Sequence, residues 1–490
     1  MRLLHTAAKT RARFDDSNLV SHAGLVPAVR LAENVGLHEL VRQYVRVAAP
    51  GGANPEVKIG CLMAGMIAGA DSIDGMDLLR HGAIPATFGG IRAPSTLGSF
   101  LRAFDYGTVR QLAAVHRRVL ARLAAQTPLL PGADTLALVD IDSMQRRVYG
   151  ASKQGAAFGH TKIASTSLLV RGLNALAATV CTPVSAPVVA AARLRGGNAA
   201  SARGAATLIA EAITTARQAG ATGTIVVRAD SAFYAGAFVA ACRRNRARFS
   251  VTVRMDSKIR RAITAIDEHA WTPIQYPNAI YDDQADEWIS DAEIAEIPYT
   301  AFASRRAHRT DGRLIIRRVK RLNPTAAAQG QGELFATYRY HAVFTDSPFH
   351  LVQAESQHRG HAVIEQVFAD LIDGPLAHLP SAQFTRQRCL APAGRHRARA
   401  NPGTGHPGLH PTRRGPRRDH PHRTHPGRRP TRPQRTRPDH LAPARRMALA
   451  SRLARRLYRH PPRTPSPGRL TPDHPPVKRH DADAKSGQAG

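Results

Sequence analysis

The sequence predicts an α/β protein in which a helical region precedes a core of alternating strands and helices. Residues 1–130 carry apolar side chains at helical spacing between Gly and Pro breaks, as in 26–45, 57–70 and 108–125. Residues 131–256 change to short apolar strands and amphipathic helices. The helical region is either an ordinary bundle with solvated charges or a DNA-binding domain. A chain of 490 residues is long enough for two or three domains.

The core region orders its elements as three strands, a helix, a strand, a helix and a strand. Apolar runs typical of strands lie at 135–142, 173–180, 186–194, 224–234 and 248–255. Helical periodicity fills 201–220, which ends in a glycine, and 235–245. An RNase H-like catalytic core needs this order before its last catalytic helix.

Two further segments complete this predicted core. Residues 257–350 are rich in β-branched and aromatic residues with alternation suited to antiparallel strands, which predicts a β-rich insertion. Residues 351–384 then contain the expected final catalytic helix. Ile364, Phe368 and Leu371 fall on one helical stripe, with Glu365 at its edge.

The composition changes at Thr385. Residues 385–490 hold 18 of the 34 prolines and 24 arginines but only two lysines. A disordered basic tail that binds nucleic acid, a low-complexity linker, and coding DNA read out of frame after a frameshift would each give this pattern. We favour the frameshift, because lysine neutralises phosphate comparably well and an evolved tail has little reason to exclude it.

The charge of the chain predicts a polyanionic partner. The formal net charge is +33, and without the tail, which has 26 basic and five acidic residues, the chain still carries +12. Nucleic acid is the first candidate. The four cysteines lie far apart without CxxC spacing, which supports neither a disulfide framework nor a zinc module. A signal peptide or membrane span is not expected, so we predict a protein of the bacterial cytosol.

Carboxylates end two of the predicted strands. Asp140 and Asp142, two positions apart, share one face of a strand, and Asp230 ends another strand. Uncompensated charges at a sheet edge are costly, so these residues predict a site for Mg²⁺ or Mn²⁺, with two ions expected, that activates water for attack on phosphate. Glu365 is the candidate third carboxylate. The alternative is that each Asp caps a helix or forms a turn.

Other catalytic motifs are missing from the sequence. It contains no GxxxxGK[ST], GxSxG or HExxH pattern, which argues against a P-loop motor, an α/β-hydrolase elbow and a zincin.

At these carboxylates the chain resembles the DDE-type insertion-sequence transposases, specifically those with a group-one DDE domain and a β-strand insertion before the final glutamate. The resemblance covers roughly residues 1–384 and is carried by LVDIDSM, VYGASKQGAAFGHTK, VVRADSAFY and HRGHAVIEQVFADLIDGPLAHLPSAQF. It implies that Asp142, Asp230 and Glu365 are the catalytic, metal-binding triad, with Asp140 as an alternative first member.

The resemblance also implies a Tyr, an Arg and a Lys at fixed distances from the glutamate that hold the DNA end. Seven and four residues before Glu365, and seven after it, this chain has His358, His361 and Ile372. Arg359 could replace part of the phosphate contact. The family continues past residue 384 with further apolar segments, and the Arg/Pro/His-rich tail does not resemble them.

Further residues are candidate DNA contacts. His160 and Lys162 lie in a predicted Gly-rich loop that either contacts phosphate or is plain surface. Trp288 either stacks on an unpaired base or belongs to a core. Four residues form a basic strand that contacts phosphate or is simply solvated: Arg313, Arg317, Arg318 and Lys320.

The reading that best unites these features is a transposase. It would bind the terminal inverted repeats of its element, cleave DNA by metal-dependent hydrolysis and join the freed 3′-hydroxyl to target DNA, and the resemblance implies a homodimer. The alternatives are another RNase H-like nuclease, which would cleave without joining, and a frameshifted inactive relic that only binds DNA.

Overall fold

The computed structural model describes residues 20–150, 152–163, 166–321 and 337–374, with single positions up to 381. The chain divides after Gly408 into two units, and all described residues belong to the first. The predicted disordered or frameshifted tail lies outside the described residues. No helix in the described part of the chain is long and apolar enough to cross a membrane.

The first described region is helical, as its periodicity predicts. Its α-helices are α1 (Leu25–Asn34), α2 (Leu37–Tyr44), α3 (Pro55–Ile67), α4 (Ile84–Thr87), α5 (Pro94–Arg102) and α6 (Tyr106–Gln126), with the 3-10 helix η2 (Asp74–Arg80). The predicted segment 26–45 is two helices, because Gly36 between them has a φ of 70° that favours glycine. The side chain of Asp105 caps α6 by accepting a hydrogen bond from the backbone N–H of Thr108.

The core then forms strands and helices in nearly the predicted order. The elements are β1 (Leu136–Arg147), β2 (Ala157–Ile163), β3 (Thr166–Cys181), β4 (Val188–Gly196), α7 (Ala205–Gln218), β5 (Thr224–Ala229), η3 (Ser231–Phe233), α8 (Gly236–Arg244) and β6 (Arg248–Val253). The prediction was wrong for the segment that holds His160 and Lys162. It is strand β2, paired with β3, rather than a Gly-rich loop, because its partner strand supplies the hydrogen bonds that a glycine-containing sequence alone does not reveal.

The remaining elements are α9 (Ser257–Thr264), η4 (Glu268–Ala270), β7 (Thr272–Pro273), β8 (Ile280–Asp282), β9 (Glu287–Ile289), β10 (Ala292–Ala301), β11 (Thr310–Arg321), β12 (Thr337–Thr345), α11 (Leu351–Arg359), η5 (Gly360–Ala362) and α12 (Val363–Ile372). The antiparallel strands predicted between 257 and 350 are present as β10, β11 and β12. They extend the central sheet, because β12 pairs with β6.

One large mixed sheet therefore dominates the described residues. Its order is β2-β3-β1-β5-β6-β12-β11-β10-β7, and β4 pairs with β3. β1, β5 and β6 are parallel neighbours, so the carboxyl ends of these three strands lie at one edge. The hairpin β8-β9 forms a separate two-stranded sheet.

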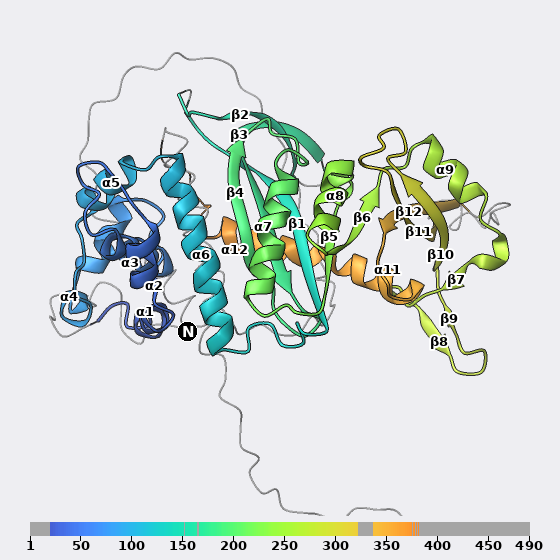
Figure 1. The fold of residues 1–490 in the computed structure, drawn as a ribbon, viewed down its shortest axis with the longest axis horizontal. Coiled ribbons are helices and arrows are strands. Elements are labelled where there is room, and N and C mark those ends of the chain that lie inside the picture. The colour runs from blue at the N-terminus through green and yellow to red at the C-terminus, as the bar shows by residue number, and fades with distance from the viewer. Residues whose placement is uncertain are drawn as a thin grey trace, which may run out of the picture. The chain divides into compact units, whose positions relative to one another are not determined.

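Helices cover both faces of the sheet (Figure 1). α7 and α8 bury apolar side chains in a core cluster on one face, together with alternate residues of β3 such as Leu176 and Ala178. α12 packs on the other face, where Leu173 and Ala175 of β3 point. The alternation of β3 between two cores follows from the two-residue period of a strand. Strands buried on both faces explain the near-continuous apolar runs in the sequence.

Candidate active site

Asp142 and Asp230 occupy adjacent positions at the edge of the sheet. Ile141 of β1 pairs with Ala229 of the parallel strand β5. The next residues along these two chains are Asp142 and Asp230. The register therefore brings together two of the predicted carboxylates.

The negative charges of Asp230 and Glu365 affect the pKa of the Asp142 carboxyl group. Its Oδ1 accepts a 2.6 Å hydrogen bond from the backbone N–H of Ser143. The pKa of Asp142 is raised to about 6, first by burial and then by the charges of Asp230 and Glu365, while the Ser143 N–H and His361 act to lower it. Neighbouring charges shift a pKa appreciably only at short range. Asp142 thus lies close enough to both Asp230 and Glu365 to interact with each of them.

Asp230 also caps a short helix, which is the alternative role that the sequence predicts for such a residue. The residue is exposed, and its Oδ1 accepts a hydrogen bond of 3.0 Å from the backbone N–H of Ala232, which caps η3. Capping satisfies one N–H at the start of the helix. It involves one oxygen of the carboxylate, so the cap and a role in binding a cation are compatible.

Glu365 is exposed in the first turn of α12, while its neighbours anchor the helix. The predicted stripe is confirmed, because Ile364, Phe368 and Leu371 are all buried with residues of β3 and β4. Because this stripe packs against the sheet, the rotation of α12 about its axis is fixed, and the opposite side of the helix faces away from the sheet. Glu365 is therefore held by the apolar contacts of its own helix.

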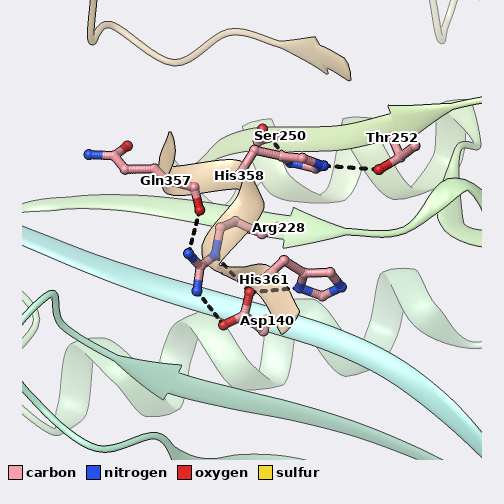
Figure 2. A network of polar contacts seen from close by, with 7 residues as sticks. All are labelled: Asp140, Arg228, Ser250, Thr252, Gln357, His358 and His361. Atoms are coloured by element: carbon pink, nitrogen blue, oxygen red, sulfur yellow. Dashed lines mark hydrogen bonds and ion pairs between the residues drawn. The ribbon is translucent and has the colours of Figure 1, made fainter. Parts of the chain in front are cut away.

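Asp140 is fully buried and forms an ion pair with Arg228, whereas Asp142 is only partly buried. The guanidinium of Arg228 donates through Nε to Oδ1 and through Nη2 to Oδ2, both at 2.7 Å. Nδ1 of His361 lies 2.8 Å from Oδ1 and carries the proton, since a carboxylate only accepts (Figure 2). Burial alone would raise the pKa of Asp140, but Arg228 and His361 outweigh it and lower that pKa.

The same polar network extends to the segment just before Glu365. Arg228 Nη1 donates to the carbonyl oxygen of Gln357 at 2.5 Å. The ring of His358 lies between two hydroxyl groups of β6, with Nδ1 2.8 Å from Ser250 Oγ and Nε2 2.9 Å from Thr252 Oγ1 (Figure 2). These contacts join α11 and η5 to strands β1, β5 and β6. They complement the apolar packing of α12 in placing Glu365 near Asp142.

The residues before Glu365 that were predicted to contact DNA have partners inside the protein. Both ring nitrogens of His358 bind hydroxyl groups inside the protein, and burial lowers the pKa of His358 to about 3, so its ring is neutral. His361 uses one nitrogen on Asp140. Arg359 pairs with Glu355 at 3.1 Å. His358 and Arg359 are committed to intramolecular contacts because their helix lies against the sheet.

Three of the four basic residues predicted to contact phosphate on β11 also have internal partners. The ion pairs are Arg313 with Glu296 at 2.8 Å, Arg317 with Glu355, and Arg318 with Glu293 at 2.6 Å and with Glu268. The guanidinium of Arg318 also lies over the rings of Trp271 and Tyr338, at 4.2 and 4.6 Å from their centroids. These arginines hold strand β11 to its neighbours through ion pairs, and their contact with phosphate stays a prediction. Lys320 remains exposed.

The other candidate DNA contacts lie apart from this network. His160 is exposed on β2, and Lys162 belongs to the same strand. Trp288 lies on β9 with its ring 5.1 Å from that of Tyr281, in a T-shaped arrangement. It is only partly buried, and the adjacent Ile280 and Ile289 are 67% and 61% exposed. Trp288 is therefore not the buried core residue of the alternative interpretation.

Arg228, the partner of Asp140, was not among the residues predicted from the sequence. A signal for it exists, because an arginine inside the apolar run TIVVRA must find an opposite charge if that strand is buried. Asp140 of the neighbouring strand is the partner of fitting charge. Recognition of this pair separates Asp140, which is neutralised internally, from Asp142, which is not.

The carboxylates suit a divalent cation chemically, but they are not arranged as a finished metal site. Carboxylate oxygens are the ligands that Mg²⁺ prefers. The pKa of Asp142 is raised first by burial and then by the like charges of Asp230 and Glu365, and a cation would relieve this repulsion. Within the described residues, however, no group of three or more His, Cys, Asp or Glu side chains is close enough together to hold a metal ion.

A mixed α/β sheet with neighbouring carboxylates where the parallel pairing of β1 with β5 ends fits enzymes that act on phosphodiesters. The family model of the transposase DDE domain, group 1, matches residues 4–329, and the chain belongs to this family. The predicted resemblance to DDE transposases is thereby confirmed. The match includes Asp142 and Asp230 but ends before Glu365, so the third carboxylate rests on the structure. No curated protein matches the chain.

Proposed function

We propose that this transposase binds the terminal inverted repeats of its element, cleaves DNA there with two divalent metal ions, and joins the freed 3′-hydroxyl to target DNA. The single observation that carries the proposal is the position of Asp142 beside Asp230 in the parallel register, with Glu365 near enough to affect the pKa of Asp142. A transposase family is a natural setting for such a set of acids. The order of elements supports an RNase H-like core, and pairing two DNA ends calls for a homodimer.

In this proposal Asp142, Asp230 and Glu365 would hold the metal ions. Such ions generate a nucleophile from water or a 3′-hydroxyl and stabilise the leaving oxygen at phosphate. The polar network of Asp140 and Arg228 positions the helix that carries Glu365. Asp140 itself is not a metal ligand in this proposal, because both of its oxygens already bind Arg228.

The test is cleavage of labelled DNA that carries the element's own ends, with Mg²⁺ or Mn²⁺. The variant Asp230→Asn keeps the cap of η3, because asparagine also accepts the backbone hydrogen bond, but removes the charge. The matched control is Asp267→Asn. Asp267 caps the 3-10 helix η4 in the same way, by accepting from the N–H of His269, and lies outside the carboxylate group.

We expect nicking at the repeat boundary for the native chain and Asp267→Asn, and none for Asp230→Asn. Joining of the cleaved 3′ end to a second duplex would distinguish a transposase from a nuclease that only hydrolyses. Binding without cleavage by the native chain would contradict the proposed activity and favour a DNA-binding relic. Undiminished cleavage by Asp230→Asn would contradict the assignment of the site.

A further inference from the structure

A second set of basic residues differs from the arginines of β11 in having no acidic partner among the residues that the structure describes. They are Arg254, Lys258, Arg260 and Arg261 in segment 254–261, and Arg305, Arg306 and Arg309 in the turn 302–309, together called the α9 surface. All seven are exposed. None of them forms an ion pair with another residue in the described part of the chain, while Arg313, Arg317 and Arg318 all do.

The acidic residues near the α9 surface do not neutralise it. The two segments contain one carboxylate, Asp256, against seven basic side chains. Asp256 is used within α9, where its Oδ1 accepts hydrogen bonds from the backbone N–H groups of Lys258 and Ile259, each at 2.9 Å. Like charges concentrated in this way repel one another and favour a bound polyanion.

The first segment begins at the edge of the sheet where Asp230 lies. Ala229 of β5 pairs with Val251 of the parallel strand β6, and Arg254 follows the end of β6 directly. Helix α9 then turns its apolar side inward, because Ile259 and Ile263 are buried in the main core cluster. The basic residues between them consequently face solvent.

The second segment lies against the chain that follows Asp230. The rings of Phe302 and Tyr234 are 4.8 Å apart. A Cβ atom at Gly236 would come within 2.6 Å of Cβ of His308, so the turn 302–309 packs closely on the start of α8. Arg305, Arg306 and Arg309 of this turn therefore extend the basic surface near the carboxylates.

We propose that the α9 surface binds the phosphate backbone of duplex DNA beside the carboxylate edge. The inference rests on the proposed function, since that function makes duplex DNA the polyanion present at this edge. Arginine binds phosphate through two parallel hydrogen bonds, which fixes the position of the duplex without reading its sequence. The surface holds the DNA next to the site at which Asp142 and Asp230 act.

The chain offers a matched pair of variants for the test. Arg260→Gln/Arg261→Gln changes two adjacent exposed arginines of α9. Arg243→Gln/Arg244→Gln changes two adjacent exposed arginines in the last turn of α8. Helix α8 leads into the first residue of β6, whereas α9 follows its last residue. Both variants lose the same formal charge in the full chain, and both retain the basic residues after Thr385.

The measurement is the dissociation constant for a fluorescein-labelled 30-base-pair duplex of arbitrary sequence, in EDTA, as a function of KCl concentration. Each lost phosphate contact lowers the salt slope by about 0.9, so Arg260→Gln/Arg261→Gln should reduce it by about 1.8 and weaken binding roughly tenfold or more at 100 mM KCl. Arg243→Gln/Arg244→Gln should leave the slope unchanged. In a second measurement, DNA should protect Arg260 and Arg305, but not Arg243, from modification by phenylglyoxal.

Equal losses in the two variants would overturn the proposal, because they would show that only total charge matters. An unchanged slope for Arg260→Gln/Arg261→Gln would overturn it as well. Polyglutamate that protects the same arginines and competes as well as DNA would replace DNA with an acidic protein as the partner. Because EDTA prevents metal-dependent cleavage, binding by the α9 surface can succeed or fail independently of the proposed activity.

Discussion

Breaking the buried ion pair between Asp140 and Arg228 should strongly destabilise the protein. The two side chains are 0% and 3% exposed and form two hydrogen bonds of 2.7 Å. Arg228→Met would leave the buried carboxylate of Asp140 with His361 as its remaining partner, and Asp140→Leu would leave the buried guanidinium of Arg228 without its carboxylate. Removal of one partner of a buried pair typically costs about 3 to 5 kcal/mol of unfolding free energy. Urea unfolding of each variant, followed by circular dichroism, measures the loss.

The double variant Asp140→Leu/Arg228→Met separates the ion pair from other effects of the substitutions. Because it removes both charges, its loss should be smaller than that of either single variant, and the double-mutant cycle should show strong coupling. Glu296→Gln, which removes a partly exposed partner of Arg313 at 2.8 Å, serves as a control and should cost under about 1 kcal/mol. Additive losses in the cycle, or single variants as mild as this control, would refute the reasoning.

Three further predictions follow from individual side chains. The pKa of His358 is lowered to about 3, so below pH 6.5 the unfolded chain binds a proton at this residue that the folded chain does not. The free energy of unfolding should therefore fall by about 1 to 2 kcal/mol between pH 7.5 and pH 5. The fall should be smaller in His358→Gln and unchanged in His160→Gln, which alters an exposed histidine. Phe368→Ala should lower the unfolding free energy by about 3 to 5 kcal/mol, whereas Val352→Ala, on the exposed side of α11, should lower it by less than about 0.5. Trp288→Ala should cost little stability but weaken binding of a duplex with an unpaired end by about 1 to 3 kcal/mol of stacking energy, measured by fluorescence anisotropy, and an effect no larger than that of Ile289→Ala would contradict base stacking.

The sequence predicted the elements whose patterns are local. The apolar runs at β1, β5 and β6 and the stripe on α12 each identify an element from a few consecutive residues. Strand β2 escaped prediction because its pairing with β3 depends on residues outside its own segment. The same limit applies to the insertion, whose strands join the central sheet only through the pairing of β12 with β6.

The acidic residues of the site were easier to predict than the basic ones. Asp142 and Asp230 are each marked by the apolar strand residues that precede them, and their closeness results from the parallel register. An arginine gives no comparable local sign of its partner. Arg317 binds Glu355, 38 residues along the chain, and Arg318 binds Glu268, 50 residues back. Basic composition alone therefore could not tell the paired arginines of β11 from the unpaired ones of the α9 surface.

The distribution of unpaired charge supports action on DNA better than the total charge does. At the carboxylate edge, burial raises the pKa of Asp142, and the negative charges of Asp230 and Glu365 raise it further. On the α9 surface, seven basic side chains have no acidic partner among the described residues. Each charge group is unfavourable by itself, so folding alone does not explain either. A DNA backbone on the basic surface and divalent cations at the carboxylates would compensate both.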